Sequence, residues 1–100
     1  MTENVEFKAE LQKGNRIQIP RLIRWQFKLE PTQVLKVKVE PVDAFMVGEE
    51  FFAKMSQDGR ITIPKLLVNL LKEDLEEKKS LVGYAFEVTL QPAETQESPE

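Results

Sequence analysis

The chain has 100 residues and contains neither cysteine nor histidine, which excludes disulfides, thiolate chemistry and the commonest general base and transition-metal ligand. The net charge of −3 is unevenly distributed, because residues 1–39 carry eight bases and four acids, whereas residues 40–91 carry six bases and ten acids. No apolar run is long enough to cross a membrane and no signal peptide opens the chain. We therefore expect a cytoplasmic protein that is not an enzyme and has no catalytic residue, metal site or cofactor.

A short motif occurs twice. Arg16-Ile17-Gln18-Ile19-Pro20 returns 44 positions later as Arg60-Ile61-Thr62-Ile63-Pro64, and from Phe7 to Lys28 the two copies align without a gap, with 8 of 22 positions identical. A repeat at a fixed offset indicates one supersecondary unit used twice. Because a half of ~45 residues is too small to be stable alone, we expect the two units to share one core.

The first unit, residues 5–40, is predicted to be strand, strand, helix and strand. Apolar and polar residues alternate in the strands, Gly14-Asn15 favours a tight turn, and Pro20 suits the start of a helix because it has no N–H to donate to a strand. These signals predict a strand over 5–12, a strand over 16–19, a helix over 20–28 and a strand over 34–40. The apolar set of the helix is Leu22, Ile23, Trp25, Phe27 and Leu29.

The second unit, residues 50–91, repeats this order. We predict a strand over 50–56, a turn at Asp58-Gly59, a strand over 60–63, a helix from Pro64 and a strand over 84–91. The helix has the apolar set Leu66, Leu67, Leu70, Leu71 and Leu75, and seven extra residues follow it. The linker 41–49 contains an apolar stretch, 44–47, that is either an extra strand or a plug over one end of the fold. Residues 92–100 are an acidic tail that we expect to be disordered.

Neither unit has enough strands to close a sheet, and open sheet edges invite aggregation. We therefore predict one mainly β domain over residues 1–91. It is a pseudo-two-fold, closed barrel of six strands with a helix at each end.

The repeated motif resembles that of the AbrB/SpoVT-type transcription regulators and the MazE-type antitoxins, which belong to the cradle-loop barrels. The likeness covers residues 5–40 and 51–90. In the first unit it rests on Arg16, Ile17, Ile19, Pro20, Ile23, Arg24, Phe27, Leu29, Pro31, Leu35 and Val37. In the second it rests on Gly59, Arg60, Ile61, Ile63, Pro64, Leu67, Leu71, Gly83 and Val88. Because these families bind DNA, usually as dimers, the resemblance implies a swapped-hairpin or RIFT barrel that binds DNA.

The chain also departs from the family pattern. The Gly-Asp after the helix is Thr32-Gln33 in the first unit and Gly83-Tyr84 in the second, and the helix-ending glycine is Lys28 and Lys72. The helix arginine is present as Arg24 but is Val68 in the second unit. No fourth strand is evident after residue 90, so the chain looks more like the small archaeal duplicated proteins of RIFT topology, with a fused swapped-hairpin barrel as the alternative.

The resemblance and the basic first half together predict a DNA-binding transcription regulator of AbrB type that contacts phosphate. Arg21, Arg24 and Lys28 recur at spacings of three and four and so share one side of the helix. The candidate DNA-binding residues are Lys13, Arg16, Arg21, Arg24, Lys28, Arg60 and Lys65. A symmetric reader of palindromic DNA would require a homodimer, whereas a barrel closed within one chain permits a monomer.

Two other interpretations stay open. The bases can be a solvated rim, or they can attract the acidic half, in which case the protein is an interaction module that binds no DNA. Trp25, beside Arg24, and Phe52, on the polar side of its strand, are either an exposed interaction surface or packed under the linker, and we expect the latter. We expect neither a membrane nor a small-molecule substrate as partner.

Overall fold

The computed structural model describes residues 4–43 and 48–93. Its elements are β1 (Val5–Glu10), β2 (Arg16–Gln18), α1 (Arg21–Gln26), β3 (Val34–Pro41), β4 (Glu49–Lys54), β5 (Arg60–Thr62), α2 (Lys65–Asp74) and β6 (Ala85–Pro92). The predicted order of strand, strand, helix and strand thus occurs twice in a small, mainly β domain. Each strand and the first helix end within about two residues of the expected positions. The tail predicted over 92–100 begins too early, because β6 continues through Pro92, which pairs with Leu35. The predictions for 44–47 and for 94–100 concern residues outside those described.

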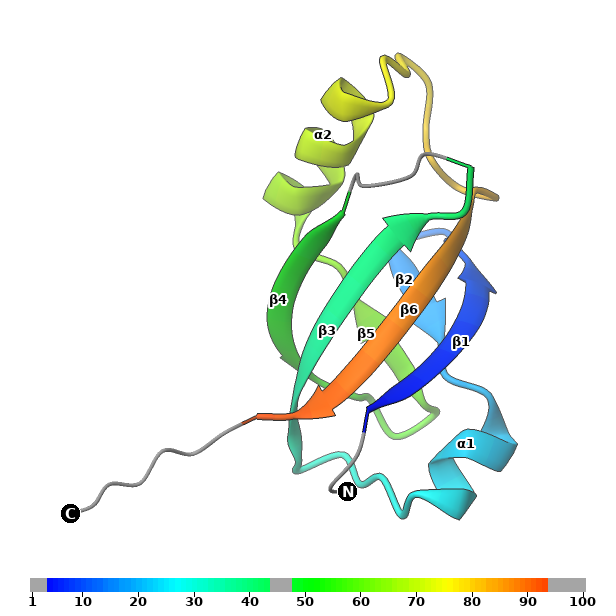
Figure 1. The fold of residues 1–100 in the computed structure, drawn as a ribbon, viewed down its shortest axis with the longest axis vertical. Helices are drawn as coiled ribbons and strands as arrows, with labels where there is room; N and C mark the ends of the chain where they lie inside the picture. The colour runs from blue at the N-terminus through cyan, green and yellow to red at the C-terminus, as the bar shows by residue number, and fades with distance from the viewer. Residues whose placement is uncertain (1–3, 44–47, 94–100) are drawn as a thin grey trace, which may run out of the picture.

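The six strands form two antiparallel sheets. The larger sheet has the order β1-β6-β3-β4, and the smaller one is the ribbon β2-β5. Figure 1 shows the ribbon behind the larger sheet, with α1 and α2 at opposite ends of the molecule. The repeat therefore places one helix at each end of a shared β structure.

The strand register preserves the relation between the two units. Phe7 pairs with Val88, and its repeat counterpart Phe51 pairs with Val37. In the ribbon, Ile17 pairs with its own counterpart, Ile61. Every pairing between two of these strands joins the first unit to the second, so each unit supplies the hydrogen-bonding partners of the other.

One apolar core lies between the two sheets. The alternating positions of the strands supply most of it, and Leu11, Leu29 and Leu81 add to it from the connections. The predicted inward residues of the motif are all buried: Ile17, Ile19, Ile61 and Ile63 expose at most 1% of their surface. Burying a side chain of this size contributes about 1.5–3 kcal/mol, which makes the repeated motif a main source of stability.

The change from strand to helix occurs at the prolines, as predicted. Pro20 and Pro64 are the N-caps of α1 and α2 and have nearly the same backbone angles, φ −56° with ψ 139° and 140°. The residue before each proline still pairs as in a strand, because Ile19 N donates to Gly59 O and Ile63 N donates to Asn15 O, both at 2.8 Å. Each helix therefore starts beside the turn of the other unit.

Both helices end in the same hydrogen-bonded motif. At α1, Lys28 N donates to Trp25 O and Leu29 N to Arg24 O, with Lys28 in the left-handed region at φ 54°. This pattern is the Schellman motif, in which glycine is the usual left-handed residue. At α2 the left-handed residue is Glu76 (φ 54°), not Lys72. The prediction that Lys72 takes the place of the helix-ending glycine is wrong, because α2 has ten residues where α1 has six. Part of the seven-residue insertion thus lengthens the helix by one turn.

Within residues 4–43 and 48–93, neither helix is long and apolar enough to cross a membrane.

Candidate nucleic-acid interface

The chain between Glu10 and Glu30 contains five bases and no acid. These bases are Lys13, Arg16, Arg21, Arg24 and Lys28. The structure distributes them over the turn between β1 and β2, the start of β2, and α1 with its C-terminal end. The predicted residues Arg60 and Lys65 begin β5 and α2. We call these seven side chains the basic stripe.

The basic stripe follows the β2–β5 ribbon from one end to the other. Ile17 and Ile61 point inward, so their neighbours point outward, with Arg16 opposite Thr62 and Gln18 opposite Arg60. The hydrogen bond from Ile63 N to Asn15 O joins the turn that contains Lys13 to the chain two residues before Lys65. Arg21, Arg24 and Lys28 lie at the α1 end. The basic stripe is therefore spread along the ribbon, with some of its bases toward α2 and others at the α1 end, and it is not one compact cluster.

Arg24 is held by the other unit. Its Nε donates to Ile19 O at 3.2 Å, and its guanidinium lies over the backbone of Gly59. A Cβ built on Gly59 would lie only 2.5 Å from Arg24 Cζ. Arg24 is consequently half-buried, and part of its hydrogen-bonding capacity is used inside the protein.

Arg60 is the base of the stripe that has a carboxylate partner among the described residues. It forms an ion pair with Asp58, and its Nε donates to Gln12 Oε1 at 2.9 Å. The Ser56 hydroxyl also donates to Asp58. This hydroxyl and the neighbouring Arg60 lower the pKa of Asp58 below its ordinary value. Asp58 therefore stays ionised and offsets the charge of Arg60.

The other six bases of the stripe have no carboxylate within 4.0 Å in the described part of the chain, where the remaining ion pairs are Lys36–Glu50 and Lys38–Glu40 on the larger sheet. Five of them are exposed, namely Lys13, Arg16, Arg21, Lys28 and Lys65. Exposed cations without a fixed partner can exchange their counterions for phosphates.

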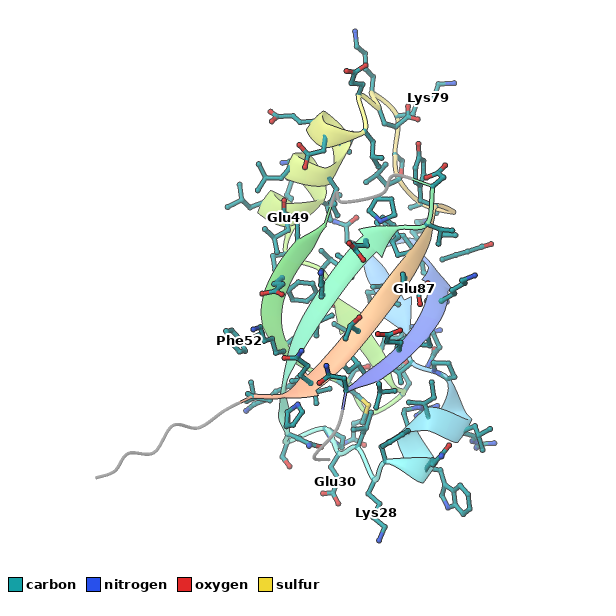
Figure 2. The ribbon with its side chains drawn as sticks, in the orientation of Figure 1. Lys28, Glu30, Glu49, Phe52, Lys79 and Glu87 are labelled. Atoms are coloured by element: carbon teal, nitrogen blue, oxygen red, sulfur yellow. The ribbon has the colours of Figure 1, made fainter. Side chains whose placement is uncertain are left out.

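The expectation that Trp25 and Phe52 pack under the linker is wrong. Trp25 exposes 76% of its surface and Phe52 exposes 64%, and Figure 2 shows Phe52 pointing away from the edge of the larger sheet. The short helix α1 reaches the core through Ile23 and Phe27, which are partly buried against it. Trp25 lies between these two positions in sequence and so faces away from the core. The same geometry leaves Leu22, also predicted as apolar packing, exposed.

A similar difference occurs in α2. Leu66 and Leu70 are exposed, although both belong to the predicted apolar set. Val68, which that set omits, is buried together with Leu71. Each helix thus uses a narrow stripe for packing and leaves several apolar side chains in water.

A shallow hollow of about 560 Å³ lies beside α1. It is lined by Arg24, Trp25, Gln26, Lys28, Leu29 and Glu30. Leu29 is buried and gives the hollow an apolar floor. Lys28 and Glu30 project from this end of the molecule, whereas Lys79 projects from the end that carries α2 (Figure 2).

Tyr84 has a structural contact at the opposite end. Its hydroxyl donates to Glu77 Oε2 at 3.2 Å. Burial, followed by this carboxylate, raises the pKa of Tyr84, while the backbone N–H of Lys79 and the Tyr84 hydroxyl lower the pKa of Glu77. The contact ties the loop after α2 to the start of β6. Among residues 4–43 and 48–93, no three acidic side chains come together in a way that could hold a metal ion.

Sequence reasoning missed the contact between Arg24 and Gly59. A signal for it exists in the repeat, because Gly59 corresponds to Asn15 and Arg24 to Val68. Arg24 of the first unit therefore faces a glycine in the turn of the second unit. The second unit, which has Val68 instead, faces a turn that has an asparagine at that position. It also missed Gln12 and Gln18, whose side chains hydrogen-bond to Arg60 and to Asp58 O in the second unit.

No protein-family model matches the chain. A "putative gluconeogenesis factor" from Thermoanaerobacterium thermosulfurigenes is 31% identical over 102 residues, an alignment that covers 93% of this chain and 32% of that protein. The chain thus spans about a third of the length of this curated relative. The solution structure of PHS018 from Pyrococcus horikoshii superposes with a TM-score of 0.65 and 21% identity, over 93% of this chain and 95% of that one. At this identity the likeness concerns the fold alone, and it agrees with the expected likeness to a small archaeal protein.

Proposed function

We propose that this domain binds nucleic acid through the basic stripe, in the manner of a DNA-binding regulator of AbrB type. The observation that carries the proposal is the acid-free segment between Glu10 and Glu30, from which Lys13, Arg16, Arg21 and Lys28 project into solvent. Lys and Arg side chains that neutralise phosphates supply most of the affinity of such proteins, because they release condensed counterions.

We also infer that the two sheets are parts of one closed barrel of the cradle-loop class. Support comes from the hairpin ends, where Gln12 N donates to Arg16 O at 2.7 Å and Ser56 N donates to Arg60 O at 2.8 Å. These bonds join the edge strands β1 and β4 of the larger sheet to β2 and β5. A closed barrel would hold the ribbon rigid and so fix the spacing of the outward-facing bases.

The outward face of the ribbon carries Arg16 and Arg60, which supports a contact in a DNA groove. A two-stranded β-ribbon is narrow enough to enter the major groove of B-DNA. Arg16 stands free of carboxylates in the described residues, while Arg60 is neutralised by Asp58. We therefore propose Arg16 and Arg21 as the main phosphate contacts, with Lys13, Lys28 and Lys65 as weaker ones. Arg24, expected from the resemblance to contribute, can offer only the part of its guanidinium that is not held over Gly59.

Binding of a fluorescent duplex oligonucleotide at several salt concentrations tests the proposal. If about four phosphates are contacted, log K should fall against log salt with a slope of roughly −3 to −4. An Arg16→Ala/Arg21→Ala double variant should weaken binding and flatten the slope by about two. The matched control is Lys72→Ala/Lys78→Ala, which removes the same charge from the α2 end and should leave the slope unchanged.

Two results would contradict the proposal. One is the absence of binding at about 50 mM salt with micromolar protein, where a phosphate-driven interaction is strongest. The other is an equal loss of affinity in the double variant and in the control, since the charge would then act without regard to its position.

A protein-interaction module is the second candidate, and the exposed apolar residues favour it. Leu22 and its repeat counterpart Leu66 expose 65% and 69% of their surfaces, and Trp25 and Phe52 are similarly exposed. Leu22 and Trp25 both lie on α1, and exposed apolar side chains that form a contiguous patch commonly mark contacts with other proteins. Failure of the wild-type protein to bind duplex or single-stranded DNA at low salt would favour this alternative over the first.

A further inference from the structure

Trp25 is exposed although it has the largest apolar side chain of α1. It leaves 76% of its surface in water, while Ile23 and Phe27 connect the helix to the core. An indole in this position gains little from folding, since the free energy of burial scales with the apolar area removed from water. Its aromatic face is available to another molecule.

Three cationic side chains lie at the same end of the molecule as this indole. Arg21 precedes Trp25 by four residues and so lies on the same side of the helix. Arg24 and Lys28 line the hollow that Trp25 also lines, above the apolar floor made by Leu29. The hollow contains one acid, Glu30. An aromatic face with several cations close by is the combination that holds a flat base together with its phosphates.

The second unit is an internal control for this arrangement. Asn69 occupies the position of Trp25, and Val68 occupies that of Arg24. α2 nevertheless starts at a proline and ends in the same Schellman motif as α1. The proline start and the Schellman end of this element therefore do not require the indole, which can serve binding.

We propose that Trp25 stacks on an unpaired base, which makes single-stranded nucleic acid the preferred ligand at the α1 end of the basic stripe. The reason for a single strand is steric: in a duplex both faces of each base are covered by its neighbours, whereas an unpaired base offers a face to an aromatic side chain. Arg21 and Lys28 then contact the phosphates on either side of the stacked base. This inference rests on the proposed function.

Trp25 is the only tryptophan in the chain, so its fluorescence reports on the site directly. The experiment titrates the full chain with an oligothymidylate of about eight residues, with a duplex of equal length and with an abasic oligonucleotide of the same phosphate number. We expect quenching and the tightest binding with oligothymidylate. The abasic oligonucleotide should leave the fluorescence unchanged, because it has no base to stack.

Variants separate stacking from charge. Trp25→Ala should weaken binding of oligothymidylate by roughly 5- to 150-fold, the range found for removal of one stacking aromatic side chain. Trp25→Phe should retain most of the affinity. Phe52→Ala is the matched control, since it removes a second strongly exposed aromatic side chain, from β4, and should have no effect. Because Trp25 is exposed, Trp25→Ala should melt at nearly the wild-type temperature.

The outcomes distinguish this inference from the proposed function. If duplex and single strand bind equally and Trp25→Ala loses no affinity, the stacking role is wrong and phosphate binding still stands. If the abasic oligonucleotide quenches as strongly as oligothymidylate, the role of the base is likewise excluded. If none of the three ligands binds at low salt, the proposed function itself fails.

Discussion

The guanidinium of Arg24 lies over Gly59, so that a helix of the first unit covers the turn of the second. Gly59 has φ +85° and is buried, and its missing side chain provides the space that the guanidinium fills. The same arginine donates to Ile19 O, directly before the proline that starts its own helix. One side chain thus links the strand-to-helix switch of one unit to the hairpin of the other.

Replacing Gly59 by alanine tests this contact. A Cβ would displace the Arg24 guanidinium, and the left-handed backbone would cost a further ~1–2 kcal/mol. With the loss of the hydrogen bond to Ile19 O, worth ~1 kcal/mol, we expect Gly59→Ala to lower the free energy of unfolding by about 2–3 kcal/mol. Urea denaturation measures it. The control is Gly83→Ala, which has φ +96° but no heavy atom within 4 Å of the new Cβ. Equal losses in both variants would mean that the Arg24 contact contributes nothing.

Exchanging the helix residues between the units tests whether Arg24 is dispensable for folding. Arg24→Val copies the second unit and should destabilise by only ~1 kcal/mol, the value of one hydrogen bond. It should also lower the salt slope of DNA binding by about one. The reverse change, Val68→Arg, should destabilise more, because Val68 is buried and Asn15 leaves no glycine gap for a guanidinium. Thermal melts and binding titrations measure both effects. A severe loss of stability in Arg24→Val would assign the arginine to the fold instead.

The two helix ends should be improved by glycine. Lys28 and Glu76 both hold φ 54°, a conformation that costs a residue with a side chain more than it costs glycine. We expect Lys28→Gly and Glu76→Gly each to raise the free energy of unfolding by roughly 0.5–1 kcal/mol. Lys72→Gly, at the repeat counterpart of Lys28 but inside α2, should lower it by a similar amount. If Lys72→Gly also stabilises, the assigned helix ends are wrong.

The stability of the domain should depend on the ionisation of Asp58. Hydrogen bonds from Ser56 and the charge of Arg60 lower the pKa of Asp58 below its ordinary value near 3.8. Such a group stabilises the folded state above its unfolded pKa, and the contribution is lost as the pH falls through the folded pKa. Asp58→Asn should therefore remove part of the fall in the free energy of unfolding between about pH 5 and pH 2. Because the carboxylate is exposed, the effect is small. Urea titrations at several pH values measure it, and identical pH profiles would exclude the ion pair.

The repeat explains how much of the fold the sequence could predict. Pro20 and Pro64 each end a strand because proline has no N–H to donate, and this signal is local in the sequence. The buried isoleucines follow from the alternation of apolar and polar residues along the strands. The helix faces were harder. A helix of six residues packs through one narrow stripe, and which residues occupy it depends on the angle at which the helix meets the core. Leu22 and Trp25 therefore look like core residues in the sequence and lie in water in the structure.

The candidate site was less predictable than the fold. The sequence predicts Arg21, Arg24 and Lys28 on one helix, but Lys28 lies just beyond the end of α1 in the left-handed region. Nor does the sequence reveal that Arg24 is half-buried against Gly59 or that Asp58 pairs with Arg60. Both contacts depend on how residues distant in sequence meet. The exposed state of Trp25 has the same origin, since it results from the packing of Ile23 and Phe27 and not from any local signal.

The strand pairings have a consequence for how such a chain is assembled. β3 lies between β6 and β4, and β6 lies between β1 and β3. Half a chain therefore keeps only the short hairpin contacts at Gln12–Arg16 or Ser56–Arg60 and lacks the partners of its long strands. Two separate halves would have to meet by diffusion, and their yield of folded protein would rise with concentration. Joining them end to end replaces that encounter by the high local concentration of a tether. When two copies are fused, folding no longer depends on protein concentration. The surface residues of one unit can then differ from those of the other, while each unit still supplies the strands that the other needs.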